Sequence, residues 1–387
     1  MSSSNIYSSD LDEETRQKIK GDMIGDSLYS ESFVLKTLLQ LSDLKWNNEI
    51  EEDYCFLWDM TADTDVCKYL FNLEFPALAC SAISRIDEPR FIEIIIGMLA
   101  NLLCAECDKN ITEEEIKVVL RELDTDDSLV LIQVNRFIAA VAHSYDTLPF
   151  LTTTEVDKLI FILNNSVNKE LIEKTLETVL KITDNFKLEQ GLVNIQLYKS
   201  VITGLQTILD ISSSDFEVND CSKTLIRFFL QIVTNVCSYT NKFSDDNLVL
   251  AISSCDMFNE ASKKVLEYLS KEENIFPLDN QLIFYIKALS YIFISVDFCF
   301  VDSIFIYFCK ILFMLHESKE DMLDVYKETV GIIGYFIFVG NQEVILNAFK
   351  KMLYLQAIFV LNSLKQNETK IEGNISAKLR YLFKEFK

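Results

Sequence analysis

The amino-acid sequence predicts an all-α protein, an armadillo- or HEAT-like right-handed α-solenoid of about six irregular repeats. Three observations indicate this fold. The 387 residues include only 9 glycines and 4 prolines, whereas the many tight turns of a β-sandwich or barrel would need more of both. Apolar residues recur with the helical period of roughly 3.6 residues along most of the chain. A longer pattern also recurs at intervals typical of armadillo and HEAT repeats.

The repeat is clearest between residues 87–102 and 126–141, which align with acidic residues in front of the helix and most apolar positions in register. A third copy fits at 171–182, and looser copies occur at 230–236, 286–292 and 330–336. One apolar anchor per copy occupies the equivalent position, and the six anchors are Leu99, Ile138, Val179, Val233, Leu289 and Ile333. One helical hairpin cannot bury its apolar face alone, so we expect stacked repeats to share a continuous core. A non-repetitive helical bundle would show the same helical period and is the alternative.

The anchors are spaced 39, 41, 54, 56 and 44 residues apart. The two longer intervals predict an extra loop or turn, at 212–219 and at 274–280. Between the anchors, the strongly apolar segment 281–316 is interrupted by charged residues. It is too interrupted to cross a membrane and is expected to form two buried core helices.

The N-terminal part is expected to differ from the repeats. Residues 1–20 are rich in Ser and acidic residues and are predicted to be a disordered tail. The helical-repeat domain then covers 21–387, with separate N-terminal helices in 21–85 and the repeats in 86–387. Within the first part, 47–53 is predicted to link to a helix through 55–60, and 61–65 is a helix-capping sequence.

The charge balance restricts the class of partner. The net charge is −23, from 59 acidic and 36 basic residues. Binding to nucleic acid needs Lys and Arg to displace counterions from phosphates, and an anionic membrane surface repels an acidic chain. We therefore expect neither partner, and expect other proteins, including basic segments. The alternative is that the acidity only maintains solubility.

No catalytic, cofactor-binding or metal-binding pattern is present, so the sequence predicts a protein that is not an enzyme. His143 and His316 have no partner at helical spacing and are interpreted as helix-end residues. Cys104 and Cys107 form a lone C-x-x-C without the second pair of a zinc site. The aspartates at 63, 65, 124, 126 and 127 lack the Gly and distant Glu of a calcium loop, so helix capping explains them better.

Four residues are candidates for partner binding. Asn101 and Asn235 occupy equivalent repeat positions, where an amide can both donate to and accept from the backbone of an extended peptide. The corresponding residues of the other copies are Ala140, Lys181, Tyr291 and Tyr335, so this ladder is incomplete. Trp58, beside Asp59, is the other candidate anchor. For the asparagines the alternative is an ordinary polar helix position, and for Trp58 the sequence favours packing in the core.

Three N-terminal segments resemble the SAAL family, which is named for serum amyloid A-like proteins. They are Gly-Asp-Met-Ile-Gly-Asp-Ser-Leu-Tyr-Ser at 21–30, Leu-Trp-Asp-Met-Thr-Ala-Asp-Thr-Asp-Val at 57–66 and Ile-Ile-Ile-Gly-Met-Leu-Ala-Asn-Leu-Leu-Cys at 94–104. The resemblance covers about residues 21–104. It implies an armadillo-type helical protein that is intracellular, nuclear or cytoplasmic, and linked to cell proliferation, with no catalytic site to carry over.

The predicted function is a non-catalytic scaffold or adaptor for protein–protein interaction. It follows from the repeat, the acidity and the lack of catalytic motifs. The alternative is an importin-like carrier of basic protein cargo, which a complete Asn ladder with interleaved Trp would favour. The free thiols expected of ten cysteines among apolar neighbours agree with an intracellular protein.

Overall fold

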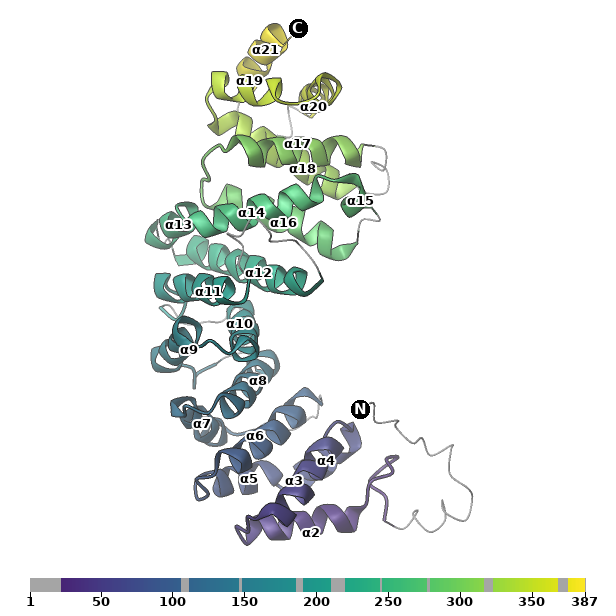
Figure 1. Ribbon diagram of the computed structural model, residues 1–387, viewed down its shortest axis with the longest axis vertical. Helices are drawn as coiled ribbons and strands as arrows, with labels where there is room; N and C mark the ends of the chain where they lie inside the picture. Colours follow the sequence, from purple (N-terminus) through teal and green to yellow (C-terminus); the bar gives the residue numbers. More distant parts are fainter. Residues whose placement is uncertain are drawn as a thin grey trace, which may run out of the picture. The chain divides into compact units, whose positions relative to one another are not determined.

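The computed structural model describes residues 22–105, 111–145, 148–185, 191–209, 220–243, 246–276, 279–316, 323–367 and 375–386. These residues form α-helices joined by short links, with a single isolated antiparallel bridge between Met23 and Ser30 (Figure 1). The chain divides into two compact units, Met1–Leu192 and Val193–Lys387. The predicted tail at 1–20 lies outside the described residues, and the expected division at residue 85 between the N-terminal helices and the repeats stays a prediction.

The first unit contains two rows of helices. One row holds α3 (Asn48–Met60), α6 (Pro89–Cys104), α8 (Ser128–Ser144) and α10 (Lys169–Asp184), and each packs against the next. Alongside lie α5 (Phe75–Ile83), α7 (Glu113–Arg121), the 3-10 turn η2 (Glu122–Asp124) and α9 (Thr153–Asn165). At the start of the unit, α2 (Glu31–Ser42) packs on α3 and α5, and α4 (Thr64–Asn72) packs on α5 and α6.

The second unit repeats this arrangement. The row of long helices is α12 (Asp220–Phe243), α16 (Asn280–Ser295) and α18 (Leu323–Val339). The remaining helices are α11 (Ile195–Ile208), α13 (Asp246–Ser253), α14 (Asp256–Leu269), α15 (Glu272–Ile275), α17 (Asp302–Leu315), α19 (Gln342–Lys350), α20 (Tyr354–Gln366) and α21 (Ser376–Glu385). Helix α17 packs against α14, α18, α19 and α20.

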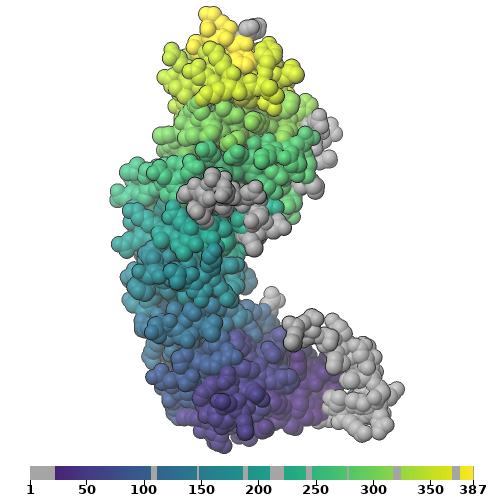
Figure 2. Space-filling model, in the orientation of Figure 1, coloured from purple at the N-terminus to yellow at the C-terminus, as the bar shows by residue number. Residues whose placement is uncertain are grey.

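The six predicted anchors confirm the repeat. They lie on the six long helices α6, α8, α10, α12, α16 and α18, one on each, and none is more than 2% exposed. Within each unit, every helix packs against helices close to it in sequence, so the surface colours follow one another in bands (Figure 2). Each unit is therefore an all-α solenoid array, as the sequence predicts, and its core is the apolar stripe between the rows.

Side-chain caps set the start of several helices. Thr112 and Thr152 form capping boxes with the Glu three residues later, and Asp63 and Asp127 accept from the first backbone N–H groups of α4 and α8. The expected link at 47–53 is wrong, because the side chain of Asn47 accepts from two backbone N–H groups and starts α3 at the next residue. The aspartates at 63 and 127 are thus helix caps, as predicted.

The apolar segment 281–316 forms two core helices, α16 and α17, as predicted. Within the described ranges, no helix is both long enough and apolar enough to span a membrane. Of the two expected loops, 212–219 lies outside the described residues. The other, 274–280, is partly helical because α15 ends at Ile275, and the interval between Val233 and Leu289 holds α13, α14 and α15.

Candidate partner-binding site

The three segments that resemble the SAAL family contact one another directly. Gly25 has a φ of +56°, a conformation that suits glycine, and a Cβ added there would lie 2.5 Å from Oδ2 of Asp65. The same Asp65 oxygen accepts from the backbone N–H of Asp26 at 3.0 Å. The turn at 22–30 is thus held against the start of α4 by a contact that needs both the glycine and the aspartate.

Trp58 packs against Gly97. A Cβ added at Gly97 would lie 2.3 Å from Cζ2 of the Trp58 ring, so the missing side chain lets α3 approach α6. Gly97 is buried and Trp58 is half-buried. Trp58 therefore packs between the two helices, and its role in partner binding stays a prediction. The adjacent Asp59 is exposed on α3 and remains a candidate for partner contact.

Asn101 joins three helices through its amide. Its Nδ2 donates to Oγ1 of Thr61, just after α3, at 2.9 Å. Its Oδ1 accepts from Nη2 of Arg136 on α8 at 2.8 Å. Arg136 also donates through Nη1 to Oε1 of Gln133 at 2.6 Å. The donor and acceptor that were expected to clamp a peptide are therefore already used to connect α3, α6 and α8.

Asn235 lies on α12 in the second unit, half-buried. Its Oδ1 accepts from Nε2 of Gln231 at 2.9 Å, within the same helix. In this unit the ladder position on α16, Tyr291, lies with its hydroxyl 3.0 Å from Oγ of Ser238 on α12. Asn101 and Asn235 belong to different units.

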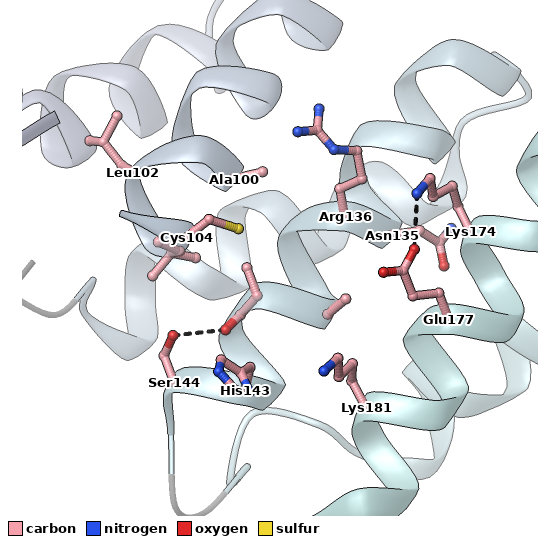
Figure 3. A pocket seen from close by; sticks show the side chains of 13 residues that line it. Ala100, Leu102, Cys104, Asn135, Arg136, His143, Ser144, Lys174, Glu177 and Lys181 are labelled. Atoms are coloured by element: carbon pink, nitrogen blue, oxygen red, sulfur yellow. Dashed lines mark hydrogen bonds and ion pairs between the residues drawn. The ribbon is translucent and has the colours of Figure 1, made fainter. Parts of the chain in front are cut away.

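A pocket opens on the face formed by α6, α8 and α10 (Figure 3). Its volume is about 540 Å³. We call it the Lys181 pocket, and its lining is Ala100, Leu102, Leu103, Cys104, Asn135, Arg136, Ala139, Ala140, His143, Ser144, Lys174, Glu177 and Lys181. In Figure 3 the Lys181 side chain reaches from α10 toward His143 of α8. Lys181, which occupies on α10 the repeat position that Asn101 occupies on α6, thus faces the pocket.

The lining of the Lys181 pocket is basic, although the chain is strongly acidic. It holds three Lys or Arg side chains and one carboxylate. Nζ of Lys174 pairs with Oε2 of Glu177 at 2.9 Å, and the guanidinium of Arg136 contacts only the neutral side chains of Gln133 and Asn101. Lys181 makes no ion pair with the described residues. Arg136 and Lys181 therefore form no ion pair with a carboxylate of the pocket in the part of the chain that the structure describes.

Asn135, on the same helix as Arg136, also contributes to the lining. It is completely buried, and its Nδ2 donates to the carbonyl oxygen of Leu131 at 2.9 Å. Its Oδ1 has no hydrogen-bond partner in the part of the chain that the structure describes. A buried acceptor without a donor costs free energy, so this atom is a local cost of packing α8 in the array.

Sequence reasoning did not identify Arg136, Lys174 or Lys181 as binding residues. The repeat alignment carried the signal that could have found two of them. It places Arg136 in register with Gly97 and Glu177, and Lys181 in register with Asn101. Reading every outward position of aligned helices, rather than asparagines alone, would have placed Arg136 and Lys181 on one face.

The two histidines and the C-x-x-C cysteines were the remaining residues considered for chemistry. His143 lies in the last turn of α8 and His316 directly follows α17, where its ring lies 4.7 Å from that of Phe359, so both are helix-end residues as predicted. Among the described residues, no group of His, Cys, Asp and Glu could hold a metal ion. Cys104 is free and exposed at the end of α6, and Cys107 lies outside the described residues.

The fold and the pocket define an α-solenoid with a polar, partly basic pocket on one face. No family model matches the chain. Among curated proteins it is similar to Protein saal1 of Danio rerio, with 26% identity over 195 residues (45% of this chain, 42% of that protein). It is also similar to Protein SAAL1 of Homo sapiens, with 28% identity over 194 residues (42% and 40%). These matches confirm the resemblance to the SAAL family, and they span less than half the length of these relatives.

Two solved structures are similar at low identity. An engineered protein aligns with a TM-score of 0.43 and 15% identity, covering 67% of this chain and 97% of that chain. Importin beta aligns with a TM-score of 0.38 and 10% identity, covering 95% and 52%.

Proposed function

We propose that the chain is a non-catalytic scaffold that binds other proteins, and that the Lys181 pocket holds an extended acidic segment of a partner. The observation that carries the proposal is the uncompensated charge of Arg136 and Lys181 in a pocket built on three successive helices. A carboxylate offered there would form charge-assisted hydrogen bonds, which are stronger than neutral ones. The proposal keeps the intracellular setting and the link to cell proliferation that the sequence resemblance implies.

The net charge of −23 does not oppose this partner at short range. Interactions between exposed charges are largely screened beyond about 8 Å at physiological salt, so the lining of the pocket decides which segment fits.

The importin-like alternative is less well supported by this face. A carrier of basic cargo would present carboxylates or free amides at the ladder positions. In the first unit these positions hold Asn101, which is engaged by Thr61 and Arg136, together with Ala140 and the cationic Lys181. A basic segment would be repelled there, so the scaffold is the function that we propose.

The test is an affinity purification from cells with tagged wild type, Lys181→Glu and Lys169→Glu, followed by mass spectrometry. Lys169 is exposed at the first turn of the same helix α10 and does not line the pocket, so it matches the change in charge. We expect a partner retained by the wild type and by K169E to be lost by K181E. A photo-crosslinking residue in place of the exposed Ser144, which lines the pocket, should attach to an acid-rich segment of that partner.

Asn101 is not a suitable position for this test, because removing its amide would disturb the packing of three helices. Melting curves of K181E and K169E must agree, so that loss of the partner reports binding rather than folding. The proposal is wrong if K181E retains every partner that K169E retains, or if the crosslinked segments are basic.

A further inference from the structure

We propose that a second groove, separate from the Lys181 pocket, docks an amphipathic segment of another protein whose apolar side chains are flanked by Lys or Arg. This groove lies between the N-terminal ends of α8 and α10 and the helix α9, and its volume is about 720 Å³. We call it the Phe161 groove. It does not depend on the function proposed for the Lys181 pocket.

The groove has an apolar floor and one prominent apolar side chain. Leu123, Leu131, Ile162 and Leu171 line it and are each less than 9% exposed. Phe161, on α9, lines the same groove but is 66% exposed. A large aromatic side chain beside an apolar hollow is the kind of feature that anchors a partner, because docking removes both surfaces from water.

The rim of the groove is acidic. Asp124 pairs with Lys158, Oδ1 to Nζ, at 2.8 Å. Asp126 and Asp157 also line the groove, are exposed, and make no ion pair with the described residues. Burial raises the pKa of the nearby Glu122, with smaller contributions from Asp87 and from Asp124 of the rim.

Charge and shape together select the occupant. The apolar floor needs apolar side chains, and the two uncompensated carboxylates of Asp126 and Asp157 need cations close to them. An acidic segment would be repelled here, whereas it suits the Lys181 pocket. The net charge led us to expect basic partners. The Phe161 groove, on α9 and the turn before α8, is the surface that would bind them.

The experiment is a selection from a random-peptide phage library on the immobilised full-length chain. Enriched peptides are then synthesised and their Kd measured by fluorescence anisotropy against purified variants. The test variants are Asp157→Lys and Phe161→Ser. The matched controls are Glu52→Lys, an exposed acidic residue of α3, and Phe56→Ser, a residue of the same helix that is 52% exposed.

We expect enriched peptides that combine apolar residues with Lys or Arg. Reversing the charge of Asp157 should weaken them by about fivefold or more, and F161S by about tenfold or more, whereas E52K and F56S should change Kd by less than about twofold. All four positions are exposed, and equal melting temperatures of the variants exclude misfolding as the cause.

Three outcomes would overturn the proposal. The first is enrichment of peptides whose binding is unaffected by D157K and F161S. The second is a library that yields no peptide binding the wild type better than F161S. The third is self-association of the wild type in analytical ultracentrifugation that F161S abolishes, which would show that a second copy occupies the groove.

Discussion

At position 97 of α6 the ring of Trp58 fills the space that any side chain would need. The added Cβ would lie 2.3 Å from the ring, closer than non-bonded carbon atoms can approach. Gly331, within α18, has no neighbouring atom within 4 Å of an added Cβ. The same change from Gly to Ala therefore has opposite consequences at the two positions.

We predict that Gly97→Ala lowers the free energy of unfolding by about 1–3 kcal/mol, because the extra methyl group overpacks the contact between α3 and α6. Gly331→Ala should raise it by about 0.5–1 kcal/mol, since Ala has the better helix propensity. Urea unfolding followed by circular dichroism measures both. Combined with Trp58→Leu, the cost of G97A should shrink; an unchanged cost would show that the ring is not its cause.

Asn101 illustrates what sequence could and could not predict about a residue. Its position on a long repeat helix was predicted correctly from the alignment with Asn235. Its use was not, because the hydrogen bonds to Thr61 and Arg136 join residues far apart in the chain. Periodicity shows which face of a helix is apolar, but it does not show which polar side chains meet across neighbouring helices.

We predict that Asn101→Ala destabilises the chain by about 1–3 kcal/mol, because it leaves Arg136 and Thr61 without their partner. Asn165→Ala is the control, since Asn165 is exposed and its amide bonds, among the described residues, only the carbonyl oxygen of Phe161 in its own helix. Thermal unfolding should show a clear decrease in Tm for N101A and almost none for N165A. Equal melting of the two variants would contradict the structural role of Asn101.

At the scale of helices, the alignment of 87–102 with 126–141 predicted two equivalent elements, and the structure has α6 and α8 there. Their starts differ in mechanism. Asp127 accepts from the backbone N–H groups of Leu129 and Val130 at 2.8 and 3.1 Å. Glu88, at the equivalent boundary, makes no side-chain cap, and Pro89 starts α6 instead. An acidic residue in register therefore does not imply a cap.

We predict that Asp127→Ala destabilises the first unit by about 1 kcal/mol, the usual loss for an N-cap. Glu88→Ala should change the stability by less than about 0.5 kcal/mol, because no hydrogen bond is lost. Urea denaturation of the two variants beside the wild type measures the difference. A comparable loss in E88A would mean that its charge near the helix start, rather than capping, governs this boundary.

Over the whole chain, the sequence predicted the order of the helices and the positions of the anchors, because both follow from periodic apolar residues. It did not predict the two faces at which we propose binding. A net charge of −23 averages over a basic lining around Lys181 and an acidic rim around Asp157. These local differences arise only when α8, α9 and α10 are brought together, so composition alone indicated just one kind of partner.

Buried thiols make the stability depend on alkaline pH. Burial raises the pKa of Cys80 to about 12, with a smaller contribution from Glu115, and burial raises that of Cys237 to about 12, whereas an unperturbed thiol has a value of 9.0. Above pH 9 the unfolded chain loses these protons while the native chain keeps them. The free energy of unfolding therefore falls as pH rises from about 9 toward 12.

We predict that the wild type loses about 1 kcal/mol more stability than Cys80→Ala between pH 7.5 and 9.5. Urea unfolding at the two pH values, with reductant present, measures the difference. In the native state at pH 8, an alkylating reagent should modify the exposed Cys104 and Cys299 before Cys80 and Cys237. Rapid alkylation of Cys80 would contradict its burial.

The contact between Trp58 and Gly97 also constrains how the sequence can diverge. Neither position can be replaced freely while the other stays, because a side chain at 97 needs the volume that the indole occupies. Among related chains we expect the two positions to change together, with a smaller residue in place of the tryptophan wherever the glycine has acquired a side chain. The packing of α3 against α6 would then appear in related sequences as correlated substitutions at positions 58 and 97, which are 39 residues apart.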